Sequence, residues 1–181
     1  MSRNVNVIIL CEDRQHEALA RRFLAIAGQG YRVQRVERSP KGRGSGEQFV
    51  RAQFAKELAY YRARQHRVGQ ALVVMIDADR RTISQRIGQV DDAAVEGGQE
   101  RRRAGERVAI FVPARNVETW LAYLAGQTVN EEDVYPRLTA ERDCQRHVER
   151  PYEMCQQGAL RQPAPPSLEA GCTEYRSRLQ L

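Results

Sequence analysis

Short apolar segments alternate with segments of helical periodicity along residues 5–124, and this alternation restricts the folds open to the chain. The clearest apolar segment is ALVVMI at residues 71–76, which contains no polar side chain. A short continuous apolar run of this kind is typical of a strand that is covered on both faces. We therefore expect residues 71–76 to lie in the middle of a sheet.

Three more segments resemble strands. They are VNVIILC at residues 5–11, YRVQRVE at residues 31–37 and VAIFV at residues 108–112. Apolar residues recur at helical spacing after each of the four segments, at about 19–27, 50–61, 83–94 and 117–124. Alternating strands and helices imply parallel pairing with right-handed crossovers. The predicted fold class is α/β, a Rossmann-like sandwich with a roughly four-stranded parallel sheet and a C-terminal helical extension.

The strand pattern stops at about residue 126. We expect residues 1–126 to form the α/β core and residues 127–181 to form a C-terminal helical cap of the same domain. Helical segments are predicted at 131–150 and 167–179, separated by a proline-rich turn at 163–166. A chain of 181 residues is long enough to bury a core as one domain.

The sequence contains neither a long apolar run nor a secretory pattern at its N-terminus, so we expect a cytoplasmic protein without a membrane partner. Disulfides are therefore not expected among its four cysteines. A zinc site is the alternative for Cys144, His147, Cys155 and Cys172, although the later spacings match no familiar zinc motif.

Basic residues give the chain a net charge of +6, and all but two of its 29 basic residues are arginines, the exceptions being Lys41 and Lys56. Arginine suits bidentate contacts to phosphate. A GC-rich genome would produce the same bias without any functional cause. The charge therefore permits a nucleic-acid partner without requiring one.

Acidic residues follow three of the predicted strands: Glu12 and Asp13 the first, Asp77 and Asp79 the third, and Glu118 the fourth. The carboxyl ends of parallel strands gather at one edge of a sheet, where ligands bind. Converging carboxylates repel one another unless a cation lies between them, and their hard oxygens suit Mg²⁺. Each acid alone could instead cap the helix that follows it. The set as a whole predicts a metal site.

Two other α/β classes also place acids after strands. A haloacid-dehalogenase phosphatase begins with Asp-x-Asp, and a receiver domain uses acids after its first and third strands. Both require a later lysine, whereas both lysines here precede Asp77. A nucleotide cofactor is not expected, because no G-x-G-x-x-G or Walker lysine motif follows a strand.

The three segments VIILCED, VVMIDAD and FVPARNVETWL together resemble the TOPRIM fold, and particularly the small stand-alone TOPRIM-like proteins of bacterial phage-defence loci, which are related to OLD-type nucleases. The resemblance covers roughly residues 5–125. It implies that Glu12 is the catalytic glutamate, that Asp77 and Asp79 bind Mg²⁺ or Mn²⁺ together with Glu12, and that Asn116 and Glu118 belong to a later motif. Glu118 is accordingly a further catalytic candidate.

The first motif departs from the family pattern. Asp13 stands where glycine is usual, and His16 with Glu17 stands where two acids are often seen. These departures place the geometry of the first loop in question.

The resemblance implies a metal-dependent endonuclease that cleaves phosphodiesters in DNA, RNA or tRNA as a toxin-like effector of antiviral defence. It further implies a separate ABC/SMC-like ATPase subunit, and a homo-oligomer is possible. Weaker candidates for contacts to substrate phosphate are Lys41, Arg43, Arg80, Arg115 and Asn116. The alternative is a catalytically inactive TOPRIM-like regulatory or scaffold subunit that binds a protein partner.

Overall fold

A parallel sheet of four strands forms the centre of the protein. The computed structural model describes residues 4–27, 30–42, 44–146 and 155–180. The strands are β1 (Val5–Cys11), β2 (Tyr31–Arg38), β3 (Gln70–Met75) and β4 (Val108–Phe111), in the order β2-β1-β3-β4. Every pairing is parallel. The predicted α/β class is confirmed, and so is the central position of segment 71–76, because β3 lies between β1 and β4.

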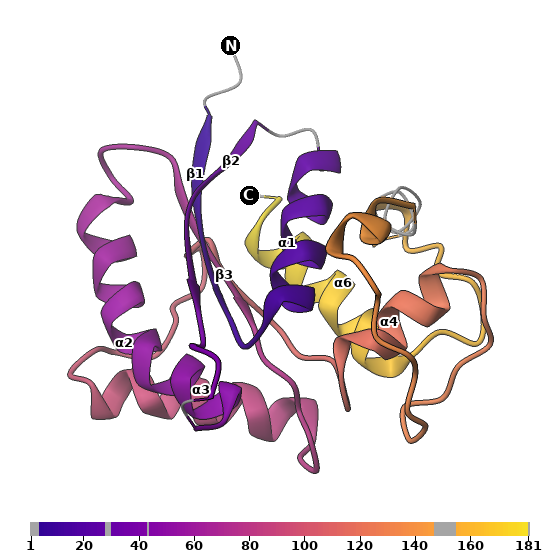
Figure 1. Cartoon of the computed structure of the whole chain (residues 1–181). Helices are drawn as coiled ribbons and strands as arrows, with labels where there is room; N and C mark the ends of the chain where they lie inside the picture. The colour runs from indigo at the N-terminus through magenta and orange to yellow at the C-terminus, as the bar shows by residue number, and fades with distance from the viewer. Residues whose placement is uncertain (1–3, 28–29, 43, 147–154, 181) are drawn as a thin grey trace.

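Helices cover both faces of the sheet, as Figure 1 shows. The helices α2 (Gly46–Arg64) and α3 (Ile83–Glu96) lie on one face. On the other face lie α1 (Arg14–Ile26), α4 (Val117–Leu124) and α6 (Pro166–Arg178). Side chains of a strand alternate between the two faces, so Ile9 packs with α1 while Ile8 packs with α2. No helix among the described residues is long and apolar enough to cross a membrane.

The C-terminal segment differs in part from the predicted pattern. Residues 127–140, all of them described, form loops and bends, and a short 3-10 helix, η1, follows at Glu141–Arg146. The helix predicted over 131–150 is therefore wrong for 131–140, and 147–150 lie outside the described residues. The side chain of Asn130 accepts the backbone N–H groups of Glu132 and Asp133, at 2.9 and 2.7 Å. Pro136 then breaks helical hydrogen bonding. The helix predicted at 167–179 is confirmed by α6.

The outer edge of β4 is capped by side chains. Glu174 of α6 accepts the backbone N–H of Ile110 at 2.9 Å, and Arg102 donates to the backbone oxygen of Val108 at 3.1 Å. Glu174 and Arg102 also pair with each other. These two side chains take the place of a neighbouring strand, since they satisfy backbone groups that an edge strand leaves open.

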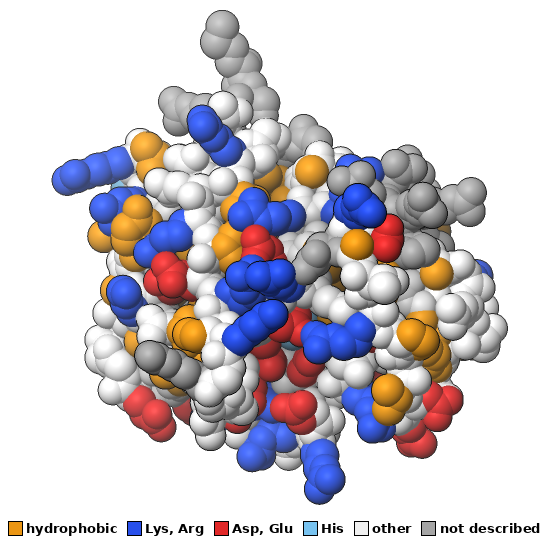
Figure 2. All heavy atoms as spheres, in the orientation of Figure 1, with side chains coloured by type: hydrophobic (Ala, Val, Ile, Leu, Met, Phe, Trp, Pro, Cys, Tyr) orange, Lys and Arg blue, Asp and Glu red, His pale blue; other side chains and the backbone are white. Residues whose placement is uncertain are grey.

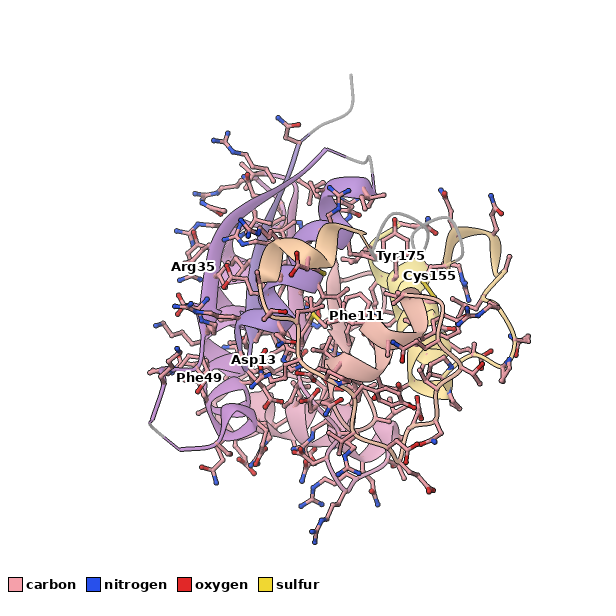
Figure 3. The ribbon with its side chains drawn as sticks, turned by 45° about the vertical axis from the view of Figure 1, so that its right-hand side comes forward. Asp13, Arg35, Phe49, Phe111, Cys155 and Tyr175 are labelled. Carbon is pink, nitrogen blue, oxygen red and sulfur yellow. A yellow bond between two sulfur atoms is a disulfide. The ribbon has the colours of Figure 1, made fainter. Side chains whose placement is uncertain are left out.

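A disulfide joins Cys155 to Cys172 of α6, whose Cα atoms are 4.9 Å apart. Figure 3 labels Cys155 and also Tyr175, which belongs to α6. The expectation of no disulfide is wrong, because folding brings two cysteines 17 residues apart within bridging distance. Two thiols of the alternative zinc set are thereby consumed. Cys144 is buried as a free thiol, and His147 lies outside the described residues.

Candidate functional site

Two of the predicted acids meet at the carboxyl ends of the two central strands. Cys11 and Met75 are paired across β1 and β3; Glu12 follows Cys11 directly, and Asp77 lies two residues after Met75. The backbone N–H of Asp77 donates to Oε1 of Glu12 at 2.6 Å. Near these strand ends, Figure 2 shows acidic side chains gathered in a hollow that is bordered by lysine and arginine side chains. The convergence expected for this edge of the sheet is therefore present for Glu12 and Asp77.

The carboxyl group of Glu12 has an unusual affinity for protons. Burial and the nearby Asp77 carboxylate raise the pKa of Glu12 to about 7, although His16 lowers it in part. A group with this pKa is present in both protonation states near neutral pH. Glu12 is therefore suited to exchange a proton with a bound molecule.

Glu12 packs against the first residue of α2. A Cβ atom added at Gly46 would lie 2.7 Å from Cβ of Glu12 and 2.8 Å from its Oε2, which is closer than real Cβ contacts allow. Glu12 can occupy its position only because residue 46 is a glycine, which has no side chain. Glu12 and Gly46 line a cleft together with Lys41 and other residues of the β1–α1 and β2–α2 loops.

A buried histidine pairs with Asp77. The His16 side chain is 1% exposed, and its Nε2 lies 3.0 Å from Oδ1 of Asp77. Burial alone would lower the pKa of His16, but the carboxylates of Asp77, Asp13 and Glu12 raise it to about 9. His16 is therefore a cation at neutral pH, and it compensates part of the negative charge at this edge. His16, one of the residues of the first loop that differ from the TOPRIM pattern which the sequence resembles, thus forms an ion pair with Asp77.

Asp79 is directed to an arginine. Its Oδ2 lies 2.9 Å from Nη2 of Arg86, and its side chain is 56% exposed. Its backbone has a φ of 54°, the only positive φ of a non-glycine residue in the described part of the chain. Burial, with the charges of Asp77 and Glu47, raises the pKa of Asp79 despite Arg86. Asp79 follows the same strand as Asp77, but its carboxylate forms an ion pair with Arg86.

Arg137, which the sequence did not indicate, forms ion pairs with Glu118 and with Asp13 and so links Glu118 to the loop after β1. Glu118 lies in the first turn of α4 with a side chain that is 5% exposed, and its Oε1 is 3.0 Å from Nε of Arg137. Burial raises the pKa of Glu118, and Arg137 lowers it only in part. Arg137 also pairs with Asp13, whose carboxylate caps α1 by accepting the backbone N–H groups of Gln15 and His16. Glu118 and Asp13 thus anchor the segment that carries Arg137.

The candidate phosphate contacts are dispersed. Lys41 is exposed in the cleft that Glu12 lines. Arg80 is exposed, and Arg115 is exposed but donates to the backbone oxygen of Glu132. Asn116 is the N-cap residue of α4, without a side-chain capping bond. Arg43 lies outside the described residues, so Lys41 is the candidate with a place beside Glu12.

Several residues that shape the site were not recognised in the sequence. These are Gly46, Glu47, Arg86 and Arg137. The glycine-rich stretch that ends at Gly46 carried a signal, since glycine marks places where another group approaches the backbone closely. The other three act through partners far away in the sequence, and no local pattern identifies them.

Glu12 and Asp77 offer carboxylate oxygens, which are ligands of the kind that Mg²⁺ binds. Mg²⁺ in proteins is commonly held by one or two carboxylates, with water and substrate phosphate completing its octahedron. Glu12 lines an open cleft, and the backbone N–H of Asp77 contacts its carboxylate. Within the ranges that the structure describes, no group of three or more His, Cys, Asp or Glu side chains is placed to hold a metal ion. The donor set therefore fits an ion that shares its coordination with water and substrate.

The chain was compared with protein-family models, with curated proteins and with solved structures, and none of the three comparisons found a match. A functional assignment for this chain consequently depends on the geometry of the site.

Proposed function

We propose that this chain is a TOPRIM-like, divalent-metal-dependent nuclease that cleaves phosphodiester bonds in nucleic acid. The observation that carries the proposal is the meeting of Glu12 and Asp77 at the ends of β1 and β3, where the N–H of Asp77 donates to Glu12. The order of acids along the chain supports the TOPRIM-like assignment, since each follows the strand that the resemblance requires.

The residues divide the chemistry between them. Glu12 and Asp77 would hold Mg²⁺ or Mn²⁺, and a bound ion would polarise a phosphoryl oxygen and stabilise charge on the attacking and leaving oxygens. Besides its part in holding the metal, Glu12 would exchange a proton with the attacking water or with the leaving oxygen. His16 fixes the orientation of Asp77 by its ion pair. The bond that breaks is the ester bond between phosphorus and a sugar oxygen.

A nucleic-acid substrate is supported by charge. The chain carries a net charge of +6, and Lys41 lies in the same cleft as Glu12. A cation at this place can hold a backbone phosphate without reading a base. DNA, RNA and tRNA all offer that phosphate. The resemblance to stand-alone members of the group supports an ATPase partner and a role in phage defence.

A second candidate function is a TOPRIM-like scaffold subunit without turnover. Two buried cations favour it: His16 pairs with Asp77 and Arg86 pairs with Asp79. These ion pairs neutralise both acids of the Asp-x-Asp motif without a metal. In a scaffold, the paired acids would stabilise the fold and have no ligand.

Cleavage assays separate the two candidates. Labelled plasmid, single-stranded DNA, RNA and tRNA are incubated with Mg²⁺ or Mn²⁺ and the wild-type protein, alone and with any ATPase encoded next to its gene. Glu12→Gln and Asp77→Asn keep the size of each side chain and remove its charge. We expect cleavage that needs the metal and that falls by on the order of a thousandfold or more in both variants.

Asp92→Asn is the matched control, because Asp92 is an exposed acid of α3 that pairs with Arg101. It should cleave like the wild type. Absence of metal-dependent cleavage on every substrate, with folded protein and a bound partner, would reject the nuclease and leave the scaffold.

A further inference from the structure

Arg86 of α3 contacts Glu47 in the first turn of α2 and Asp79 in the loop after β3. We propose that Arg86 is a positioning residue that keeps Asp79 as its own partner, so that Glu12 and Asp77 are the carboxylates that hold the metal. This inference rests on the proposed function. It assigns Asp79 a different task from the one that the resemblance implies.

Arg86 is buried and makes contacts in several directions. Only 3% of its side chain is exposed. Nη1 donates to Glu47 at 2.9 Å and to Gln89 at 3.1 Å, and Nη2 donates to Asp79 at 2.9 Å and to the backbone oxygen of Ala78 at 3.2 Å. A buried guanidinium is expensive unless its charge is compensated. Glu47 and Asp79 supply that compensation, and Glu47 also accepts from Arg51 at 2.7 Å.

The backbone around Asp79 is held from two sides. The N–H of Ala78 donates to the backbone oxygen of Pro113 at 2.8 Å, which continues the pairing of β3 with β4 beyond the strand ends. On the other side, Arg86 binds the oxygen of Ala78 and the carboxylate of Asp79. The left-handed conformation of Asp79, with φ of 54°, costs free energy for a residue with a Cβ atom. The contact with Arg86 stabilises this conformation, in which the Asp79 carboxylate is turned to α3.

The same arginine supports the place of Glu12. Glu47, which accepts from Arg86, is the neighbour of Gly46, and Gly46 is the residue against which Glu12 packs. Arg86 therefore connects the start of α2 with the loop after β3. A shift of the start of α2 or of the loop after β3 would change the separation between Glu12 and Asp77, because Glu12 packs against Gly46 and Asp77 lies in that loop.

Binding of Mn²⁺, followed by electron paramagnetic resonance or calorimetry, tests this assignment without any substrate. Removal of a ligand should weaken Mn²⁺ binding by on the order of a hundredfold, whereas removal of a partner of a ligand costs about tenfold. We expect the larger loss in Glu12→Gln and Asp77→Asn. Asp79→Asn and Glu47→Gln should both show the smaller loss, because each removes one carboxylate that accepts from Arg86; Glu47→Gln also removes the partner of Arg51.

Arg86→Lys separates position from charge, since lysine keeps the charge but lacks the planar fork that reaches all four acceptors. We expect this variant to bind Mn²⁺ about tenfold more weakly at temperatures where it is fully folded. A purely structural role would lower the thermal midpoint and leave the affinity unchanged. Arg101→Met removes an arginine from an exposed pair with an aspartate, and it should bind Mn²⁺ like the wild type.

A loss in Asp79→Asn as large as that in Asp77→Asn, with Glu47→Gln unaffected, would make Asp79 a metal ligand and overturn the proposal. Wild-type affinity in Arg86→Lys would overturn it as well.

Failure of the proposed function gives a different result, namely a wild-type protein that binds no Mn²⁺. Arg86 is then judged by thermal unfolding of Asp79→Asn in the wild-type and Arg86→Met backgrounds. We expect Asp79→Asn to lower the midpoint in the first background and to have little effect in the second. Equal effects in both would show that Arg86 does not hold Asp79.

Discussion

The carboxylate of Glu12 is fixed by two backbones that lie far apart in the sequence. One is the N–H of Asp77, which donates to Oε1 at 2.6 Å, and the other is Gly46 at the start of α2. The hydrogen bond is short, and the space between Glu12 and Gly46 is too small for a side chain at position 46, so the carboxylate has little freedom to move. A glycine at this position is consequently part of the site, even though it brings no functional group.

Replacement of Gly46 by alanine should displace Glu12, because the new Cβ would lie 2.7 Å from Cβ of Glu12. We expect Mn²⁺ binding and cleavage to fall by about tenfold or more. Gly88→Ala is the control, since a Cβ at that position of α3 meets nothing within 4 Å. It should raise the free energy of unfolding by roughly 1 kcal/mol through helix propensity alone and leave Mn²⁺ binding intact. Unchanged binding in Gly46→Ala would contradict the prediction.

The sequence predicted the places of Glu12 and Asp77 because both follow apolar strands, and strand ends in a parallel sheet converge. It could not predict the contacts of His16 or Arg86. His16 meets Asp77 across 61 residues, and Arg86 meets Glu47 across 39. Pairs at such separations depend on how the helices pack, which no local pattern records. Asp79 fits the Asp-x-Asp spacing, yet its direction is decided by Arg86.

At the level of elements, an ion pair fixes the end of α2 to the loop before β4. Arg62 donates to Glu106 through Nε at 2.8 Å and through Nη2 at 3.1 Å, and both side chains are largely buried. Glu106 also accepts the backbone N–H of Arg103 at 2.8 Å. This pair holds α2 and the loop before β4 together.

Stability should depend on pH through Glu106. Burial works to raise the pKa of Glu106, but the hydrogen bonds from Arg62 and Arg103 lower it below its ordinary value of 4.5. A lowered pKa in the folded state means that the ionised group stabilises the fold above pH 4.5 and that this contribution is lost as the pH falls through the folded-state pKa. Glu106→Gln should therefore lower the free energy of unfolding by about 1–3 kcal/mol at pH 7.

Urea unfolding between pH 7 and pH 3 measures this difference, which should shrink below about pH 4. Glu100→Gln removes a neighbouring exposed acid that pairs with Arg103, and it should change stability little at any pH. A difference between wild type and Glu106→Gln that stays constant down to pH 3 would contradict the role of the charge.

For whole elements, apolar runs were sufficient to locate strands but charged segments were not sufficient to locate helices. The four strands begin and end within one residue of their predicted limits. By contrast, 131–140 contains charged residues with some helical spacing, and its structure is decided by the Asn130 turn and by Pro136. A segment that buries few side chains gains too little from packing to stabilise a helix.

Across the whole molecule, the C-terminal segment is joined to the α/β core. Trp120 of α4 donates to Ser167 of α6 at 2.7 Å, and Leu168, Tyr175 and Leu179 are buried in the same cluster as β1 and β3. The Cys155–Cys172 disulfide fixes the residues before α6 to the helix itself. The described part of this segment therefore shares its core with the sheet.

Loss of the disulfide should destabilise the protein as a whole. The bridge closes a loop across 17 residues, and a loop of that size stabilises a protein by about 3 kcal/mol. Reduction, or the pair Cys155→Ser and Cys172→Ser, should lower the thermal midpoint by roughly 10 °C. Cys144→Ser is the control, because Cys144 is a free thiol and this variant should still respond to a reductant. Equal midpoints with and without a reductant, with reduction verified by mass spectrometry, would show that the bridge is dispensable.

Because the edge of β4 is capped, a further strand could pair with this sheet only at its other edge. Glu174 and Arg102 occupy the backbone groups that an added strand would need at that side. At the opposite side, β2 is paired with β1 alone among the described strands. If a second polypeptide extends this sheet, it must therefore attach beside β2, next to the loop that carries Lys41 into the cleft of Glu12. A strand added there would adjoin the entrance to the site, whereas α6 closes the other side against any such extension.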